Sequence, residues 1–312
     1  MGQPTAIKHA LHPQTGAAKK RPLDTVPPGR IVRQHLKSDR ETVYFVYRSA
    51  RPQPDVPLMV SVHGMQRRAD LQAKLFAPFI DAIGGTLVAP VFQRRRYDDY
   101  QRLGRHGRGD RSDLILKAIL AEQTMQTGIS ARTIVLFGYS GGGQFVHRFA
   151  MANPRQVSRM AIAAPGWYTF PNPRLSYPDG IGNCRDLPDL FLDPARFLQI
   201  PTLVLVGDQD IDRDPNLNRR GKLDVRQGKN RLERGRNWIE AMRTAAARYN
   251  YDTHFGFSVL PGCGHSFPDC MAKGEMGRQV INFLFNGRGR STHPYDADRS
   301  FSSYLTDAKG DI

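Results

Sequence analysis

Three polar residues stand directly after predicted strands, and their types could together transfer an acyl group. Ser140 is the middle residue of a Gly-x-Ser-x-Gly motif at residues 138–142, and Asp210 and His265 each follow a later apolar run. A serine hydroxyl becomes an effective nucleophile when an imidazole accepts its proton, and a buried carboxylate holds that imidazole in the required tautomer. These residues are far apart in the sequence, so only a fold can bring them together.

The motif at residues 138–142 lies between a strand pattern and a helix pattern. Residues 133–137 are apolar and largely β-branched, which is typical of a strand buried on both faces, and residues 144–151 have helical periodicity. A sharp strand-to-helix turn brings two backbones close together and therefore needs glycine at both outer positions of the motif. This context predicts an exposed, nucleophilic Ser140; a serine that only caps the helix is the alternative.

Strand and helix patterns alternate along the chain. Strands are expected at residues 41–47, 58–62, 86–91, 133–137, 160–164, 202–206 and 255–260, and helices at 70–83, 112–125, 144–151, 232–248 and 275–285. Such alternation predicts a mostly parallel, twisted sheet with helices on both faces. The carboxyl ends of parallel strands lie at one edge of a sheet, so Ser140, Asp210 and His265 are expected to meet there.

The chain divides by composition into an arm, one domain and a tail. The 312 residues and 40% hydrophobic content are sufficient for a single large core. Residues 1–38 are polar and basic and are expected to form a mobile N-terminal arm with a short strand at its end. Residues 39–287 form the predicted domain, and residues 288–312 form a polar C-terminal tail. Residues 165–200, rich in proline and aromatic residues, are expected to form a short cap between two late strands.

From about residue 40 to 287 the sequence resembles the α/β-hydrolase superfamily, and within it small serine esterases and polyhydroxyalkanoate-depolymerase-like hydrolases. The matching segments are His63-Gly64-Met65, Gly138-Tyr139-Ser140-Gly141-Gly142, Gly207-Asp208-Gln209-Asp210 and Gly264-His265. The resemblance implies the α/β-hydrolase fold, with Ser140 as the nucleophile, Asp210 as the acid and His265 as the general base.

Residues near these motifs are also candidates for the oxyanion hole and for the acid. The backbone N–H of Gly141, at the first turn of a helix, is expected to stabilise the oxyanion, and by resemblance the N–H of Met65 is the second donor. Asp208 is the alternative acid, but the superfamily usually places the acid three residues after the glycine, which favours Asp210. His63 is expected to support its own loop rather than act as the base.

Aromatic residues near the predicted site have two open interpretations. Tyr139 and Trp167 are assigned to substrate binding. The aromatic residues of the predicted cap could form the wall of an acyl pocket or the core of the cap itself; they are Trp167, Tyr168, Phe170 and Tyr177. His106 and His147 are expected at the surface or on a helix face.

The chain carries a formal net charge of +16. This balance indicates either a polyanionic partner or an arginine-biased composition that aids solubility, and no motif indicates binding to nucleic acid. Arginines follow three predicted strand ends: Arg67, Arg68, Arg94, Arg95, Arg96, Arg219 and Arg220. They would give the cleft a positive field that selects an anionic substrate; alternatively, they are solvated and partly paired with Asp98, Asp99 and Asp110.

The sequence implies no metal and no cofactor. Its cysteines, Cys184, Cys263 and Cys270, form no C-x-x-C motif, and Cys263 and His265 alone are too few ligands for zinc. No apolar run approaches the roughly 20 residues of a membrane span, and residues 1–36 lack a signal-peptide pattern. We therefore expect a cytoplasmic protein that acts on a small-molecule or polymeric ester.

Hydrolysis of a carboxylic ester through an acyl-enzyme is the predicted function. An amidase, a peptidase or an acyltransferase would use the same serine, acid and histidine, because the acyl-enzyme is common to all of them. A non-catalytic binding protein on the same fold is a further alternative, although such a protein would be expected to lack one of the three residues.

Overall fold

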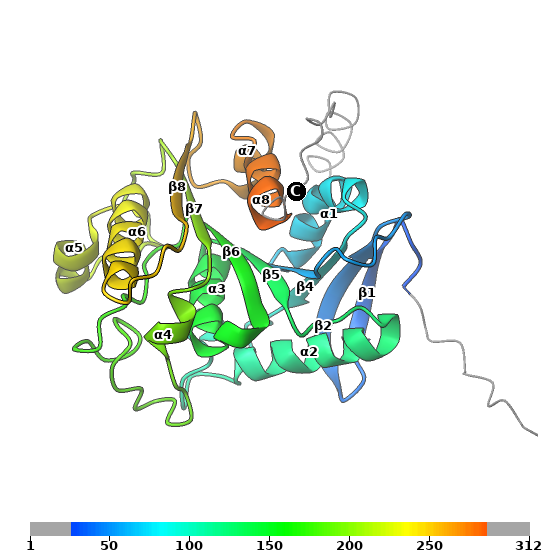
Figure 1. Ribbon diagram of the computed structural model, residues 1–312, viewed down its shortest axis with the longest axis horizontal. Coiled ribbons are helices and arrows are strands. Elements are labelled where there is room, and N and C mark those ends of the chain that lie inside the picture. Colours follow the sequence, from blue (N-terminus) through cyan, green and yellow to red (C-terminus); the bar gives the residue numbers. More distant parts are fainter. Residues whose placement is uncertain (1–25, 286–312) are drawn as a thin grey trace, which may run out of the picture.

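An eight-stranded sheet forms the centre of the computed structural model, which describes residues 26–285 (Figure 1). Its order is β1-β2-β4-β3-β5-β6-β7-β8; β1 and β2 are antiparallel to their neighbours and the other pairs are parallel. The strands are β1 (Ile31–Leu36), β2 (Asp39–Arg48), β3 (Met59–Val62), β4 (Thr86–Val91), β5 (Ile134–Tyr139), β6 (Val157–Ala163), β7 (Thr202–Gly207) and β8 (Phe255–Leu260). The predicted mostly parallel sheet is confirmed.

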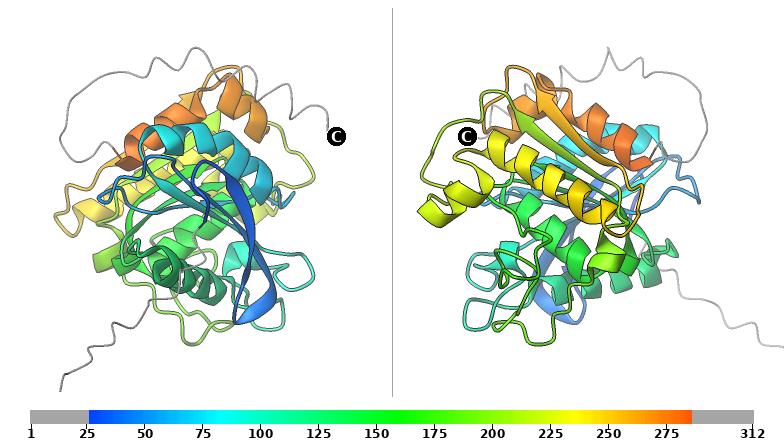
Figure 2. Two further views of the ribbon diagram at one scale, coloured as in Figure 1. Left: turned by 90° about the vertical axis from the view of Figure 1, so that its right-hand side faces the viewer. Right: turned by 60° about the vertical axis from the view of Figure 1, so that its left-hand side comes forward.

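Helices cover both faces of this sheet, as predicted (Figures 1 and 2). One face carries α1 (Ala69–Ala82), α7 (Phe267–Ala272) and α8 (Met276–Phe285), and the other carries α2 (Ser112–Thr127), α3 (Gly141–Ala152) and α6 (Arg231–Ala247). The shorter helices are η1 (Tyr100–Arg102), η2 (Pro154–Gln156), α4 (Pro194–Phe197) and α5 (Gly221–Gln227). Within residues 26–285, none of these helices combines the length and the apolar character needed to cross a bilayer.

The position of β5 in the sheet explains why residues 133–137 are almost all apolar. Ile134 and Leu136 belong to the buried cluster on one face of the sheet, and Val135 and Phe137 belong to the cluster on the other. Successive side chains of a strand point to opposite faces, so a strand covered on both sides has no polar position. Its carboxyl end is therefore anchored from both layers.

The N-terminal end of the described chain already belongs to the sheet. β1 is the short strand expected at the end of the arm, and it pairs with β2 from Ile31 opposite Tyr47 onward. Most of the arm, residues 1–25, and the tail at 288–312 lie outside the described residues.

Residues 165–200 connect β6 to β7, where the cap was expected. They contain little regular structure beyond α4, and the aromatic side chains of Trp167, Tyr168 and Tyr177 are buried. Tyr168 stacks on Trp238 of α6 with ring centroids 4.8 Å apart. For Tyr168 this arrangement favours a role in the core of the connection over a role in the wall of a pocket.

Candidate active site

Ser140 occupies a strained turn between β5 and α3. Its backbone has φ 54° and ψ −114°, in the left-handed region of φ that a non-glycine residue rarely adopts. A Cβ on Gly138 would lie 2.3 Å from the carbonyl oxygen of Gly142, and a Cβ on Gly142 would lie 2.0 Å from that of Val62. The close approach of backbones expected from the motif is therefore present, and it presents Ser140 at the carboxyl end of β5.

The structure brings together the three side chains predicted to do the chemistry. Nε2 of His265 lies 3.0 Å from Oγ of Ser140, and Nδ1 of the same ring lies 2.7 Å from Oδ2 of Asp210. A carboxylate only accepts hydrogen bonds, so Nδ1 donates to Asp210 and Nε2 is left to accept from the serine hydroxyl. This tautomer is the one in which an imidazole can take the proton of Ser140.

Two loops that follow β7 and β8 place the carboxylate beside the imidazole. A Cβ on Gly207 would lie 1.9 Å from the carbonyl oxygen of Cys263, so these loops touch through their backbones. The side chain of Asp208 accepts a hydrogen bond from the N–H of Cys263 at 3.2 Å, and the N–H of Gln209 donates to the Cys263 carbonyl at 3.0 Å. Asp208 thus binds the loop of His265, whereas the side chain of Asp210 contacts its ring.

Arg231, which the sequence analysis did not single out, lies behind the Asp210 carboxylate. Its guanidinium is 1% exposed and donates to Oδ1 of Asp210 at 3.0 Å and also to Asp214. Burial lowers the pKa of Arg231, but the bonds to the two carboxylates outweigh it and leave that pKa raised. Both oxygens of Asp210 are therefore held in place, and Asp214 shares the guanidinium of Arg231 with it.

The loop after β3 lies against the first turn of α3. A Cβ on Gly64 would lie 3.4 Å from Cβ of Ser140, and a Cβ on Gly141 would lie 3.1 Å from the sulfur of Met65. Within residues 26–285, the N–H groups of Met65 and Gly141 donate to no acceptor. Both N–H groups are thus free for an incoming oxygen, while their role as an oxyanion hole stays a prediction.

His63 supports the loop that carries Met65. Its Nδ1 donates to the carbonyl of Gly64 at 2.8 Å, and its Nε2 accepts from the N–H of Phe92 at 2.9 Å. The hydroxyl of Tyr100 donates to the His63 carbonyl at 2.9 Å. Burial lowers the pKa of His63 to about 4, so the ring is neutral and both nitrogens are engaged in structural bonds.

The two further histidines that the sequence analysis placed, His106 and His147, differ in their environments. His106 is exposed, as expected. His147 lies on α3, which agrees with the helix-face alternative, but it is fully buried, so the expectation of a surface position was wrong. Its Nδ1 donates to the carbonyl of Gly143 at 2.8 Å and its Nε2 accepts from the N–H of Thr169 at 3.0 Å, so it links α3 to the connection after β6.

The two side chains assigned to substrate binding are both buried. Tyr139 stacks on His265 with ring centroids 5.3 Å apart and also contacts Phe267. It therefore supports the imidazole, and a direct contact with substrate stays a prediction. Trp167 lies under the guanidinium groups of Arg148 and Arg220, whose central carbons are 4.4 Å and 5.4 Å from its ring centroid.

Many of the arginines expected at the mouth of the cleft are paired. Arg96 donates to Asp39 at 2.6 Å and to Asp110 at 3.0 Å. Arg68 pairs with Asp70, Arg95 with Glu41, Arg67 with Asp98 and Arg220 with Asp179. For these five arginines, the contacts agree with the alternative in which the side chains are solvated and partly paired.

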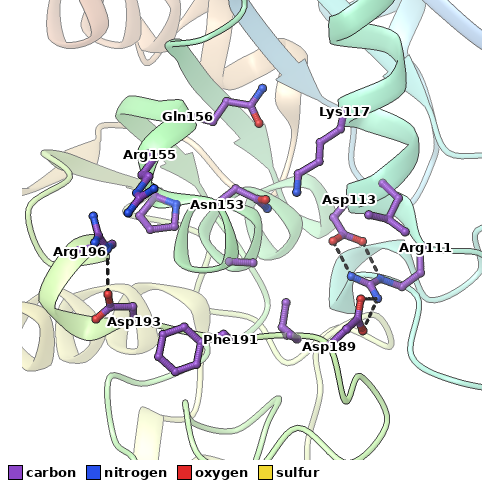
Figure 3. A pocket seen from close by; sticks show the side chains of 14 residues that line it. Arg111, Asp113, Lys117, Asn153, Arg155, Gln156, Asp189, Phe191, Asp193 and Arg196 are labelled. Carbon is purple, nitrogen blue, oxygen red and sulfur yellow. Dashed lines mark hydrogen bonds and ion pairs between the residues drawn. The ribbon is translucent and has the colours of Figure 1, made fainter.

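A hollow of about 660 Å³ lies beside Asn153, which directly follows α3 (Figure 3). Ser140 is at the other end of this helix. Its lining includes Asn153 and Gln156, which follow α3, and charged side chains, several of which pair with one another. Arg111 binds both Asp113 and Asp189, and Arg196 binds Asp193. Because α3 runs away from Ser140, this hollow is not part of the site around the serine.

Solved structures similar to this chain are hydrolases. Neither a protein-family model nor a curated protein matches the sequence. The poly(3-hydroxybutyrate) depolymerase LpqC from Bordetella parapertussis is 28% identical, with a TM-score of 0.68 over 85% of this chain and 92% of that one. Poly(aspartic acid) hydrolase-1 from Sphingomonas sp. KT-1 is 23% identical, with a TM-score of 0.65 over 78% and 93%.

An S-formylglutathione hydrolase from Agrobacterium tumefaciens shares the fold at 14% identity, with a TM-score of 0.52 over 81% of this chain and 94% of that one. The eight-stranded sheet with helices on both faces is the architecture that the resemblance implied, so the predicted fold is confirmed. With this sheet order the chain has the α/β-hydrolase fold, and it is similar in structure to esterases and other hydrolases of that superfamily.

Proposed function

We propose that the protein is a serine hydrolase that cleaves a carboxylic ester through an acyl-enzyme formed on Ser140. The observation that carries the proposal is the continuous hydrogen-bond series from Ser140 through His265 to Asp210. Each member of the series has the residue type, and the ring has the tautomer, that acyl transfer to a serine requires.

The first half of the reaction forms the acyl-enzyme. Oγ of Ser140 attacks the ester carbonyl carbon while Nε2 of His265 takes the hydroxyl proton, and Asp210 stabilises the resulting imidazolium. The carbonyl oxygen gains negative charge and accepts hydrogen bonds from the N–H groups of Gly141 and Met65. When the tetrahedral intermediate collapses, the carbon–oxygen ester bond breaks and His265 gives its proton to the departing alcohol.

The second half of the reaction uses water as the nucleophile. His265 takes a proton from water, the hydroxide attacks the acyl carbon, and the bond to Oγ of Ser140 breaks as the proton returns to the serine. The products are a carboxylic acid and a regenerated enzyme. Arg231 holds Asp210 in place through both halves, because its guanidinium contacts the oxygen of Asp210 that faces away from His265.

An ester rather than an amide is the proposed bond. The solved structure with 28% identity is named for a depolymerase of poly(3-hydroxybutyrate), which is a polyester, and this supports a small-molecule or polymeric ester for the present chain. An amidase or an acyltransferase is the second candidate, since either would begin with the same acyl-enzyme.

The bond is tested by comparing two substrates with one acyl group. We expect 4-nitrophenyl butyrate to be hydrolysed with a kcat/KM at least about a thousandfold above that for the 4-nitroanilide of butyric acid, the rates being followed by absorbance. Comparable values for the two substrates would assign the protein to amide cleavage. Release of nitrophenol only when an acceptor alcohol is added would assign it to acyl transfer.

A further inference from the structure

A second hollow, of about 540 Å³, has many arginine side chains in its lining. Three chain segments form it: residues 102–108, residues 167–179 of the connection after β6, and residues 218–226 around α5. Its six lining arginines are Arg102, Arg105, Arg108, Arg174, Arg220 and Arg226. Asp179 is the one acidic residue in this lining, so positive charge dominates the hollow.

Neighbouring carboxylates balance only part of this charge. Asp179 pairs with Arg220 at 2.9 Å and with Arg226 at 3.7 Å, so one carboxylate serves two guanidinium groups. Asp99 likewise accepts hydrogen bonds from both Arg102 and Arg105, and Arg105 also pairs with Asp186 at 3.8 Å. More cations than anions therefore surround this space.

Two of the six arginines have no partner. The side chains of Arg108 and Arg174 are exposed, and neither forms an ion pair or a hydrogen bond with another part of residues 26–285. Arginine presents a planar fork of N–H donors that matches the two oxygens of a carboxylate. These two side chains are available to bind a carboxylate that enters the hollow.

Arg148 adds a buried cation under the floor of the hollow. It is 0% exposed and forms no ion pair with the described residues; its Nε donates to the Thr169 hydroxyl at 2.8 Å and Nη1 to the Gln101 carbonyl at 2.7 Å. Its Nη2 is buried and has no hydrogen-bond partner. The guanidinium lies against Trp167, and Trp167 lines the hollow. A buried charge without a counter-ion is costly, so an anion above Trp167 is favoured.

Arg148, which packs against Trp167 of the hollow, is linked to Ser140 along α3. The N–H of Gln144 donates to the Ser140 carbonyl at 3.1 Å, and Arg148 donates to the Gln144 carbonyl at 3.1 Å. Arg148 is eight residues after Ser140, which corresponds to roughly 12 Å along the helix axis. That separation suits a group of the substrate several bonds away from the bond that reacts.

The hollow shown in Figure 3 makes a useful contrast. Its lining holds Arg111, Lys117, Arg155 and Arg196 but also Asp113, Asp189 and Asp193, so its charges nearly balance. It also lies at the far end of α3. Of these two hollows, the one beside Trp167 has the larger excess of positive charge, and it is the one that lies next to the buried Arg148.

We propose that the arginine-lined hollow binds the carboxylate of an anionic ester, so that the preferred substrates are esters that carry a carboxylate several bonds from the ester carbonyl. The inference rests on the proposed ester hydrolysis for the reacting bond. Arg108 and Arg174 hold the carboxylate directly, and the charge of Arg148 beneath Trp167 favours it at longer range.

The proposal is tested with 4-nitrophenyl half-esters of suberic acid and of sebacic acid, compared with the same molecules in which the free carboxyl is methylated. We expect kcat/KM for the acid to exceed that for its methyl ester. In the double variant Arg108→Gln, Arg174→Gln we expect the ratio of the two values to fall about tenfold, because two charges that contact the carboxylate are removed. The matched control is Arg132→Gln, an exposed arginine before the amino end of β5, which should leave the ratio unchanged.

A binding measurement separates this proposal from the proposed function. Suberate is titrated calorimetrically into Ser140→Ala and into Ser140→Ala combined with the two arginine changes, with inorganic phosphate as the competing anion. We expect suberate to bind more tightly than phosphate, and its affinity to fall about tenfold in the combined variant. An unchanged affinity for suberate, or equal affinities for suberate and phosphate, would overturn the carboxylate site even if neutral esters are cleaved. Conversely, suberate binding without hydrolysis of any ester would overturn the proposed function and leave the site standing.

Discussion

His265 offers its two ring nitrogens to different partners, and this division determines what each side chain can do. Nδ1 donates its proton to Oδ2 of Asp210, with 2.7 Å between the two atoms, so Nε2 faces the Ser140 hydroxyl with its lone pair. A second carboxylate, Asp208, lies two residues before Asp210 and could in principle replace it. Its side chain instead accepts from a backbone N–H of the histidine loop, at Cys263.

We therefore expect the removal of charge at Asp210 and at Asp208 to lower kcat by different amounts. Asp210→Asn should lower kcat by about three to four orders of magnitude, because the amide favours the wrong tautomer of His265 and does not stabilise its charged form. Asp208→Asn should keep kcat within about tenfold of the parent, since the amide oxygen can still accept from Cys263. Steady-state kinetics on 4-nitrophenyl butyrate measures both, and the reverse order would transfer the role of the acid to Asp208.

At the scale of elements, the position of Ser140 depends on backbones that approach each other more closely than a side chain allows. The carbonyl of Val62, at the end of β3, lies 2.0 Å from where a Cβ on Gly142 would be. Neither the buried strand nor the first turn of α3 can move without disturbing both faces of the core. The glycine is thus a steric requirement of the turn between β5 and α3.

Gly142→Ala should accordingly lower the free energy of unfolding by about 3 kcal/mol, as expected for severe overpacking. The matched control is Gly221→Ala in the first turn of α5, where a Cβ meets nothing within 4 Å and helix propensity favours alanine. Urea unfolding followed by circular dichroism measures both variants. If the two variants were equally stable, the close approach at the turn would not constrain the fold.

The loop after β3 predicts a dependence of stability on pH. The pKa of His63 is about 4 in the folded protein because of burial, against an ordinary value of about 6.5 in the unfolded chain. As the pH falls, the unfolded chain therefore binds a proton at His63 before the folded protein does. The contribution of neutral His63 to the free energy of unfolding is present above pH 6.5 and is lost as the pH falls toward 4. The difference corresponds to about 3 kcal/mol across that window.

Urea unfolding at pH 7 and at pH 4.5 gives the free energy of unfolding of each protein at both pH values. The decrease in this free energy from pH 7 to pH 4.5 should be smaller in His63→Gln than in the parent. The buried His147, whose pKa burial lowers well below its usual range, acts in the same direction and is retained in both proteins. The comparison therefore isolates His63. Identical pH dependences in the two proteins would show that His63 is not held neutral by the fold.

Periodicity predicted the long elements well and the short ones poorly. The strand at residues 86–91, which is buried along most of its length, and the strand at residues 255–260, whose interior is only partly buried, both have the predicted bounds. The helices α5 and α7 have seven and six residues, fewer than two full turns, so they contain no repeat that a pattern could detect. Their positions depend on tertiary contacts.

At the scale of the whole molecule, a parallel sheet explains why a candidate site could be predicted from scattered motifs. The residues Ser140, Asp210 and His265 each follow a strand, and parallel strands end at one edge, so strand order mattered less than strand direction. The residues of the candidate site that could not be predicted from the sequence are those whose partners depend on how the loops pack. Arg231 carried no signal among so many arginines, yet it contacts Asp210.

The basic composition also has a structural use that charge counting did not reveal. Arg148, Arg231 and Arg234 are each about 1% exposed or less, and they bond to the loops around the site. Arg234, for example, donates to the backbone carbonyls of Gly166, Gly228 and Asn218. Some of the arginine side chains thus hold the loops near Ser140 together through hydrogen bonds. Other arginines gather in the arginine-lined hollow.

The role of Ser140 as the nucleophile is tested most directly by covalent labelling with a fluorophosphonate, located by peptide mass spectrometry, together with ester hydrolysis by Ser140→Ala. We predict a single adduct on Ser140 in the parent and none in Ser140→Ala, whose turnover of 4-nitrophenyl butyrate should fall by about four orders of magnitude or more while its circular dichroism stays unchanged. An adduct on another residue, or a folded Ser140→Ala variant that keeps ester hydrolysis within tenfold of the parent, would contradict the account.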